Sequence, residues 1–147
     1  IVNSLYLQPD ELESRILERF ERYEQIKQKH TRSEEYLVDD ADYIVVAYGA
    51  TSRIVRSAVN TARARGIKVG MIRPMTLWPF PAEPIAKAAG HAKAFLSVEM
   101  SMGQMVDDVR LAVNGKAPVG FFGRTGGIIP TPAEVLSEIE KMAGGDK

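Results

Sequence analysis

The sequence of 147 residues contains no cysteine. This absence excludes disulfide bonds, thiolate nucleophiles and cysteine-ligated iron–sulfur clusters from the chain itself. Histidine is almost as scarce, and His30 and His91 stand far apart, without other ligands at the spacing of a metal site. We therefore predict no zinc or iron site, and any redox or metal chemistry would have to lie in another domain or subunit.

Long apolar runs and an excess of charge are also absent. No run approaches the roughly 20 apolar residues that span a bilayer, and the N-terminus lacks the pattern of a secretory signal. Nineteen basic and nineteen acidic side chains cancel, so the chain has no net attraction to nucleic acid or anionic lipid. We expect a soluble, cytoplasmic chain that binds neither nucleic acid nor membrane. Because it opens with Ile1, we interpret it as a piece of a longer polypeptide.

An amphipathic helix is predicted near the start of the chain. In residues 10–29 the apolar side chains Leu12, Ile16, Phe20 and Tyr23 recur every three or four residues, which is the spacing of one helix face. The remaining positions of this segment are dense in charge. We expect this helix to lie outside the repeating part of the fold.

Apolar runs alternate with helical periods in the rest of the sequence. Such alternation is typical of an α/β domain in which helices cover both faces of a mostly parallel sheet. Four buried strands are predicted, at residues 43–48, 67–73, 94–99 and 118–122. A shorter apolar patch at residues 36–38 indicates an edge strand. A threonine cap, a proline and a glutamate at residues 131–134 predict the start of a final helix that ends near Met142.

Loops that leave the carboxyl ends of parallel strands form the ligand-facing edge of such a sheet. The first of these loops leads into Ser52 and Arg53, and its glycine, hydroxyls and helix start could hold a carboxylate or a phosphate. The alternative is an ordinary turn in which Ser52 caps the helix. The loop has neither the GxGxxG spacing of a dinucleotide site nor the lysine of a P-loop.

Two charged side chains are candidates at this edge. Arg124 lies among glycines and could bind a carboxylate or phosphate in a bidentate manner, or it could hold its loop to a neighbouring acid. Glu99 ends a predicted strand and could act as an acid or base, or it could accept hydrogen bonds from the helix start near Gly103. No second carboxylate stands at a spacing that forces proximity, and Ser101 fits no nucleophile pattern. The residues alone therefore give no support to hydrolase chemistry, and both roles of Glu99 stay open.

Aromatic and methionine side chains occupy the other loops of the same edge. Trp78 and Phe80 alternate with prolines in a stiff loop that is either tucked under the domain or offered to a partner. The loop that ends at Gln104 carries methionines that could form an adaptable contact surface or fill the core: Met100, Met102 and Met105.

Four motifs carry a family resemblance. They are Ala41-Asp-Tyr-Ile-Val-Val-Ala-Tyr-Gly-Ala-Thr51, Arg73-Pro-Met-Thr-Leu-Trp-Pro-Phe-Pro81, Val98-Glu-Met-Ser-Met-Gly-Gln104, and Gly123-Arg-Thr-Gly-Gly127 with Pro130. In this order they resemble the C-terminal domain of the α subunit of 2-oxoacid:ferredoxin oxidoreductases. The resemblance covers residues 35–147 and is closest to the branched-chain 2-oxoacid or 2-oxoglutarate members.

This resemblance implies a fold and a division of the chain. The same motif order is more loosely similar to the last domain of transketolase and of the E1 β subunits. It implies a three-layer α/β/α sandwich with a five-stranded, mostly parallel sheet and one short antiparallel edge strand near residues 36–38. Residues 1–34 would then be a helix and linker from a preceding domain, and residues 35–147 a transketolase C-terminal-like domain.

The resemblance also implies a function for the whole enzyme. Members of the family decarboxylate a 2-oxoacid on thiamine diphosphate, pass electrons through iron–sulfur clusters to ferredoxin, and release an acyl-coenzyme A. No segment that binds thiamine diphosphate, magnesium or a cluster matches this sequence. The chain is therefore expected to be a non-catalytic interface domain that binds no cofactor and is inactive alone. A free-standing small-anion-binding module and a regulatory α/β module stay open as alternatives.

The expected partners are the cofactor-bearing domain of the same subunit and the other subunits, with ferredoxin binding to the whole complex. The loop edge would dock on the cofactor-bearing domain, and its candidate contacts to a partner or an anion are Ser52, Arg53, Trp78, Phe80, Glu99, Gln104 and Arg124.

Overall fold

Five strands form the central sheet: β1 (Ser33–Tyr36), β2 (Tyr43–Val46), β3 (Val69–Pro74), β4 (Ala94–Glu99) and β5 (Val119–Gly123). The computed structural model describes residues 4–144. The strands lie in the order β1-β3-β2-β4-β5, and β2 to β5 pair in parallel, whereas β1 runs antiparallel to β3. The predicted five-stranded, mostly parallel sheet with an antiparallel edge strand is confirmed.

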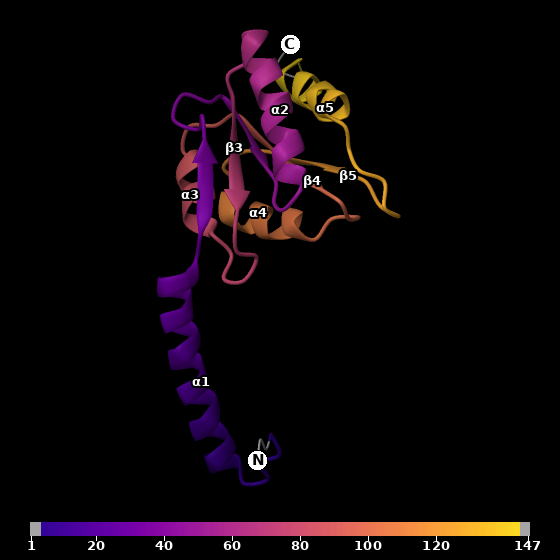
Figure 1. The fold of residues 1–147 in the computed structure, drawn as a ribbon. Coiled ribbons are helices and arrows are strands. Elements are labelled where there is room, and N and C mark those ends of the chain that lie inside the picture. Colours follow the sequence, from indigo (N-terminus) through magenta and orange to yellow (C-terminus); the bar gives the residue numbers. More distant parts are fainter. Residues whose placement is uncertain (1–3, 145–147) are drawn as a thin grey trace.

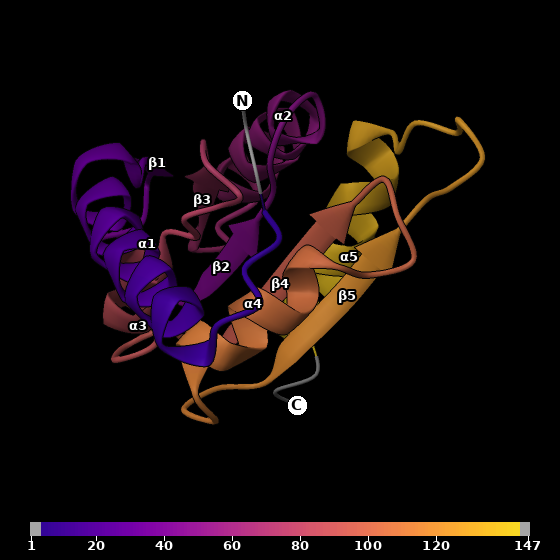
Figure 2. The same ribbon diagram turned by 90° about the horizontal axis from the view of Figure 1, so that it is seen from below.

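Helices cover both faces of this sheet (Figures 1 and 2). On one face lie α2 (Thr51–Ala64) and α5 (Pro132–Gly144), whose side chains form one apolar cluster with the sheet. On the other face lie α3 (Ala82–Ala88) and α4 (Met105–Val113), which form a second cluster. Together with the sheet, these two layers make the predicted α/β/α sandwich.

The central strand β2 explains why the strand predictions hold. Its four residues are all buried, because Val45 faces the cluster under α2 and α5 while Ile44 and Val46 face the cluster under α3 and α4. A strand covered on both faces appears in the sequence as a continuous apolar run. For this reason the four predicted parallel strands agree with β2, β3, β4 and β5 to within a few residues.

The edge strand is displaced from its predicted position at residues 36–38. β1 ends at Tyr36, and Leu37 follows it with a φ of 54° that interrupts the strand. Pairing with β3 sets Glu34 opposite Arg73, and the Glu34 carboxylate forms ion pairs with Arg73 at 3.2 Å and with Arg56 of α2. This strand is held by backbone pairing and by charges distant in the sequence, so its apolar pattern does not reveal it.

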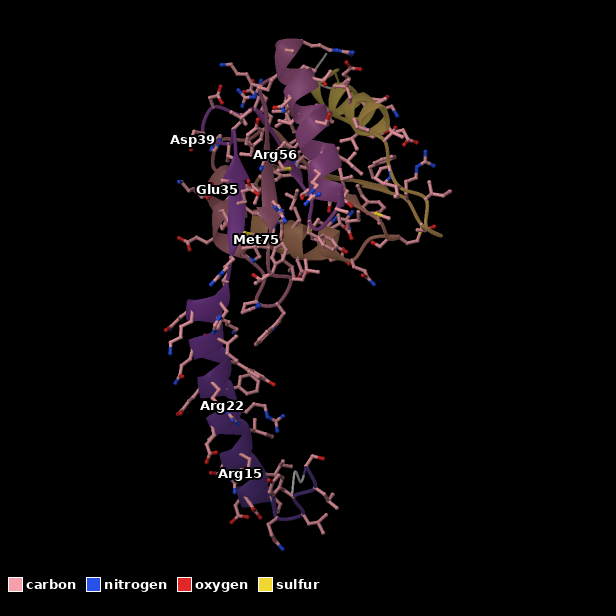
Figure 3. All side chains as sticks on the ribbon, viewed as in Figure 1. Arg15, Arg22, Glu35, Asp39, Arg56 and Met75 are labelled. Carbon is pink, nitrogen blue, oxygen red and sulfur yellow. The ribbon has the colours of Figure 1, made fainter. Side chains whose placement is uncertain are left out.

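The helix predicted over residues 10–29 is α1 (Pro9–His30), which projects from the sandwich (Figure 1). None of its 22 residues is buried. Because β1 is antiparallel, its first residue, Ser33, lies opposite Pro74 at the carboxyl end of β3, and α1 leaves the sandwich at this end. Figure 3 shows Arg15 and Arg22 along α1, far from Arg56 on the sandwich. Within residues 4–144, no helix has both the length and the apolar character that crossing a membrane requires.

Candidate functional site

Glu99 ends β4 and is completely buried, with an exposed fraction of 0%. Its carboxylate accepts hydrogen bonds of 2.9–3.0 Å from the backbone N–H groups of Gln104, Met105 and Val106 and from the hydroxyls of Ser97 and Ser101. These N–H groups belong to the start of α4, where the helix has no capping side chain of its own. Of the two predicted roles for Glu99, the structure therefore shows the one in which it binds the following helix.

The charge state of Glu99 follows from these contacts. Burial raises the pKa of the carboxyl, but the hydrogen bonds from Gln104, Ser101 and Met105 outweigh burial and bring the pKa below its ordinary value of 4.5. The ionised carboxylate also interacts favourably with the positive end of the α4 dipole. A carboxylate stabilised in its charged form serves poorly as a proton donor near neutral pH.

Arg124 lies on the loop that follows β5, and its guanidinium pairs with the carboxylate of Glu134 in α5. Glu134 also accepts hydrogen bonds from the N–H of Thr131 at 2.8 Å and from its hydroxyl at 2.9 Å, while its own N–H donates to that hydroxyl at 3.3 Å. These last contacts are the predicted capping arrangement at residues 131–134, which is confirmed. Arg124 thus holds its loop to a neighbouring acid, the second of its two predicted roles.

The turn before α2 departs from the prediction that Ser52 caps the helix. α2 begins at Thr51, with Ala50 as its N-cap, and no side chain caps its free N–H groups. Ser52 therefore already lies within the first helical turn, and its buried hydroxyl donates a hydrogen bond of 2.7 Å to the carbonyl of Gly49. Arg53 beside it is exposed.

The proline-rich loop after β3 was predicted to be either tucked under the domain or exposed to a partner, and its two aromatic residues take one position each. Phe80 is half-buried and packs against the cluster under α3 and α4, so it is tucked under the domain. Trp78 is 57% exposed, and its ring meets Tyr23 of α1 edge-on, with 5.3 Å between the ring centroids. The loop therefore fixes one aromatic ring in the core and presents the other beside α1.

The methionines near Glu99 are likewise divided between core and surface. Met105 is buried in the cluster under α3 and α4, whereas Met100 is 41% exposed and Met102 is 83% exposed. The loop that carries them lies beside the loop after β5, because the N–H of Arg124 donates to the carbonyl of Glu99 at 3.1 Å.

The large exposed apolar side chains of the described residues fall into two groups, and all but Leu37 and Leu111 belong to one or the other. The first group lies in residues 5–30, here called the arm, which includes α1. The second, here called the apolar loop edge, comprises Met75, Leu77, Trp78, Met100, Met102, Ile128 and Ile129. Both surfaces lie at the carboxyl end of the parallel strands, because the arm leaves the sandwich there (Figure 1).

The sequence reasoning did not single out Ile128, Ile129 or the contact between Tyr23 and Trp78. Two adjacent isoleucines in a glycine-rich loop are a visible signal, since such loops are usually polar. The contact between Tyr23 and Trp78 joins residues 55 positions apart in the sequence, so no local pattern could reveal it.

A protein-family model matches the chain over residues 41–135: pyruvate:ferredoxin oxidoreductase core domain II. Among known relatives, ketoisovalerate oxidoreductase subunit VorB of Methanothermobacter thermautotrophicus is 47% identical over 144 residues, which are 98% of this chain and 41% of that protein. 2-Oxoglutarate synthase subunit KorA of Methanothermobacter marburgensis is 43% identical over 104 residues, 71% of this chain and 28% of that protein. The chain thus spans about two fifths of the VorB relative.

Solved structures agree on the fold. A 2-oxoglutarate:ferredoxin oxidoreductase from Magnetococcus marinus superposes with a TM-score of 0.80 at 23% identity, over 94% of this chain and 24% of that one. A split-gene transketolase superposes with a TM-score of 0.61 at 18% identity, over 75% of this chain and 40% of that one. The resemblance to the 2-oxoacid:ferredoxin oxidoreductases, with a transketolase-like fold, is confirmed. The chain belongs to the pyruvate:ferredoxin oxidoreductase core domain II family.

Proposed function

We propose that this chain is a non-catalytic structural and interface domain in the α subunit of a thiamine-diphosphate-dependent 2-oxoacid:ferredoxin oxidoreductase. The whole enzyme would oxidatively decarboxylate a 2-oxoacid to an acyl-coenzyme A and transfer electrons to ferredoxin. The arm would lead in from a preceding domain, and the sandwich would be the interface domain itself; because β1 begins at Ser33, the sandwich starts two residues before the predicted boundary at residue 35. Its partners would be the cofactor-bearing domain of the same subunit and the other subunits.

One observation carries this proposal: three polar candidates at the carboxyl edge, Ser52, Glu99 and Arg124, are engaged within the chain, whereas the apolar side chains of this edge are exposed. Glu99 accepts hydrogen bonds from its own helix, Arg124 pairs with Glu134, and Ser52 donates to Gly49. Beside them Met102 and Ile129 are 83% and 60% exposed. Several exposed apolar side chains along one edge of a sheet are typical of a surface that another protein covers.

The donor groups of this chain do not fit the metal cofactors of such an enzyme. The sequence has no cysteine for an iron–sulfur cluster. Residues 4–144 contain no group of three or more histidine, aspartate and glutamate side chains that could hold a metal ion. We propose that thiamine diphosphate, magnesium and the clusters are bound by other domains or subunits.

The relatives support a substrate class. Those named as ketoisovalerate oxidoreductase subunits match 98% of this chain, which includes the arm, whereas those named as 2-oxoglutarate synthase subunits match 65–74%. We therefore propose a branched-chain 2-oxoacid as the substrate of the whole enzyme. Turnover of the native complex with 2-oxoisovalerate and with 2-oxoglutarate, compared at equal concentrations, tests this assignment, and a preference for 2-oxoglutarate would contradict it.

The interface role is tested in the native complex with paired variants. Ile129→Ser and Met102→Ser should weaken assembly by about tenfold or more, because losing a desolvated anchor commonly costs about 2 kcal/mol. Leu111→Ser is the matched control, since Leu111 is 77% exposed but lies outside both apolar surfaces. Assembly is followed by native mass spectrometry and activity by 2-oxoacid-dependent viologen reduction. Equal behaviour of all three variants would refute the interface role of the loop edge.

The inactivity of the separate domain has its own test. The purified 147-residue chain, supplied with thiamine diphosphate, magnesium, coenzyme A and 2-oxoisovalerate, should not reduce viologen. Turnover by the pure chain would show that the chemistry lies within it. Saturable binding of a small anion to the separate chain, without any effect of the loop-edge variants on the complex, would favour an anion-binding module.

A further inference from the structure

A hollow lined by aromatic side chains lies between α1 and the loop after β3, and the proposed function assigns it no role. Phe20, Tyr23, Lys27 and Trp78 line this hollow, which has a volume of about 390 Å³. The ring centroids of Phe20 and Tyr23 are 5.7 Å apart, and those of Tyr23 and Trp78 are 5.3 Å apart. Three aromatic rings thus line the hollow, together with the side chain of Lys27.

We infer that this hollow is a socket for one large apolar side chain from the remainder of the longer polypeptide to which the arm and the sandwich belong. This inference rests on the proposed function, because it takes the chain to be one domain of a larger subunit. It goes further by naming the anchoring site and the side chain that fits it. The apolar loop edge would be a second contact on the same partner.

The walls of the socket are held in place before any partner arrives. The N–H of Arg32, just after α1, donates to the hydroxyl of Thr76 at 3.0 Å, and the N–H of Met75 donates to the carbonyl of Arg32 at 3.0 Å. The Thr76 hydroxyl also donates to the carbonyl of Pro79 at 2.8 Å, which fixes the loop beside Trp78. A preorganised site loses less conformational entropy on binding than a flexible one.

The chemistry of the walls indicates the occupant. Phe20 and Trp78 are each 57% exposed, so their faces present apolar area that water covers in the separate chain. Aromatic faces pack best against aliphatic, thioether or other aromatic side chains. Lys27, the one charged side chain that lines the hollow, is paired with Glu24 at 2.6 Å, so its charge is balanced by a neighbouring carboxylate. A mostly apolar lining suits an anchoring pocket for an apolar side chain.

The relatives indicate which chain supplies that side chain. The match to VorB includes the arm and the sandwich, yet it accounts for only 41% of the VorB chain. The remaining part of such a polypeptide is covalently tied to the socket, so its effective concentration there is far higher than that of any separate molecule. An intrachain occupant is therefore favoured over a second copy or another subunit.

Photo-crosslinking in the native complex tests this inference. Replacing Phe20 by p-benzoylphenylalanine places a reactive group at the wall of the socket, and Arg22, which lines a different hollow on α1, receives the same replacement as the control. After irradiation, the Phe20 variant should give a cross-link within its own polypeptide, outside the 147 residues, to an apolar segment. The Arg22 variant should not, and adding Trp78→Ala to the Phe20 variant should reduce the yield several-fold.

Other results would overturn the inference. A cross-link to another subunit or to a second copy would show a different occupant, and the absence of any cross-link would show that the hollow is open to solvent. The proposed function is judged separately by the Met102 and Ile129 variants. The socket can therefore fail while the loop edge retains its interface role, and the loop edge can fail while the Phe20 cross-link forms.

Discussion

α1 and α2 are both amphipathic helices, but only α2 packs its apolar face against the sheet. α2 has 14 residues and buries six of them, which are Thr51, Ser52, Val55, Ala58, Val59 and Ala62. α1 has 22 residues and buries none, although Leu12, Ile16 and Phe20 follow the same helical spacing. An apolar stripe thus indicates that a helix face will be covered, without showing whether its own domain covers it. The stripe of α1 is exposed because the sandwich does not cover it.

A pair of matched truncations tests this contrast between a buried and an exposed helix face. Ile139→Ala in α5 should lower the free energy of unfolding by about 4 kcal/mol, because it leaves a cavity in a core where Ile139 is 0% exposed. Ile16→Ala in α1 should change it by less than about 0.5 kcal/mol, since Ile16 is 37% exposed. Urea unfolding of the separate chain measures both values. A similar cost for the two variants would mean that α1 is part of the folding core.

Glu99→Gln should have the next largest effect. The amide cannot accept all the hydrogen bonds that converge on the Glu99 carboxylate, so we expect a loss of about 3 kcal/mol. Because the pKa of Glu99 is lowered on folding, its contribution is complete above about pH 4.5 and is lost as the pH falls below this value. The difference between wild type and E99Q in urea should therefore shrink between pH 7 and pH 3.

Asp108→Asn is the control for this charge effect. Asp108 is an exposed carboxylate on α4, the helix that Glu99 caps, and its substitution should cost less than about 0.5 kcal/mol. A D108N variant as unstable as E99Q would assign the effect to the helix charge and not to the buried hydrogen bonds.

Gly70→Ala should have a moderate effect on the sandwich. A Cβ atom at Gly70 would lie 2.5 Å from the carbonyl oxygen of Leu37, in the backbone that leads out of β1. That backbone would have to move, and we expect a cost of about 2 kcal/mol in urea unfolding. Gly144→Ala, at a position with nothing within 4 Å of the added atom, serves as the control. An unchanged stability for G70A would show that β1 can shift freely against β3.

The smallest expected effect concerns the base of the arm. Thr76→Ala removes the hydroxyl that accepts from Arg32 and donates to Pro79, which costs about 1 kcal/mol of local stability at an exposed site. Fluorescence quenching by acrylamide should increase, because Trp78 is the only tryptophan of the chain and depends on this loop for its position. Thr61→Ala, an exposed threonine of α2, should leave the quenching unchanged. Equal quenching in T76A and wild type would contradict the idea that the loop is fixed to the arm.

The sequence predicts the covered parts of this molecule well and the connections between distant parts less well. The parallel strands were predictable because burial on both faces demands continuous apolar runs, as in β2. The capping role of Glu99 was one of two predicted possibilities, because an acid before a helix start has local partners. β1 was placed three residues late, because Glu34 is held by Arg56 and Arg73 from other elements. The alternative in which Ser52 caps α2 sets the N-cap two residues too late, because the structure has Ala50 at this position.

In the candidate site, too, the sequence predicts the possible roles of a residue, whereas only the fold supplies its partner. The role of Arg124 could be narrowed to two possibilities, but only the fold brings Glu134 to it. Trp78 and Phe80 are both aromatic residues followed by a proline, yet Phe80 packs against the core while Trp78 is exposed beside Tyr23. Whether an apolar side chain is buried or exposed depends on packing across the chain, which local patterns do not contain.

Hydrogen exchange of α1 in the separate chain and in the native complex tests the central claim most directly. If the arm is covered by the rest of the enzyme, its amides should exchange rapidly in the separate chain and at least about tenfold more slowly in the complex, which corresponds to about 1.4 kcal/mol of added protection. The amides of α2, already buried against the sheet, should change little. Equal, rapid exchange of α1 in both states would contradict the claim that the arm is an interface.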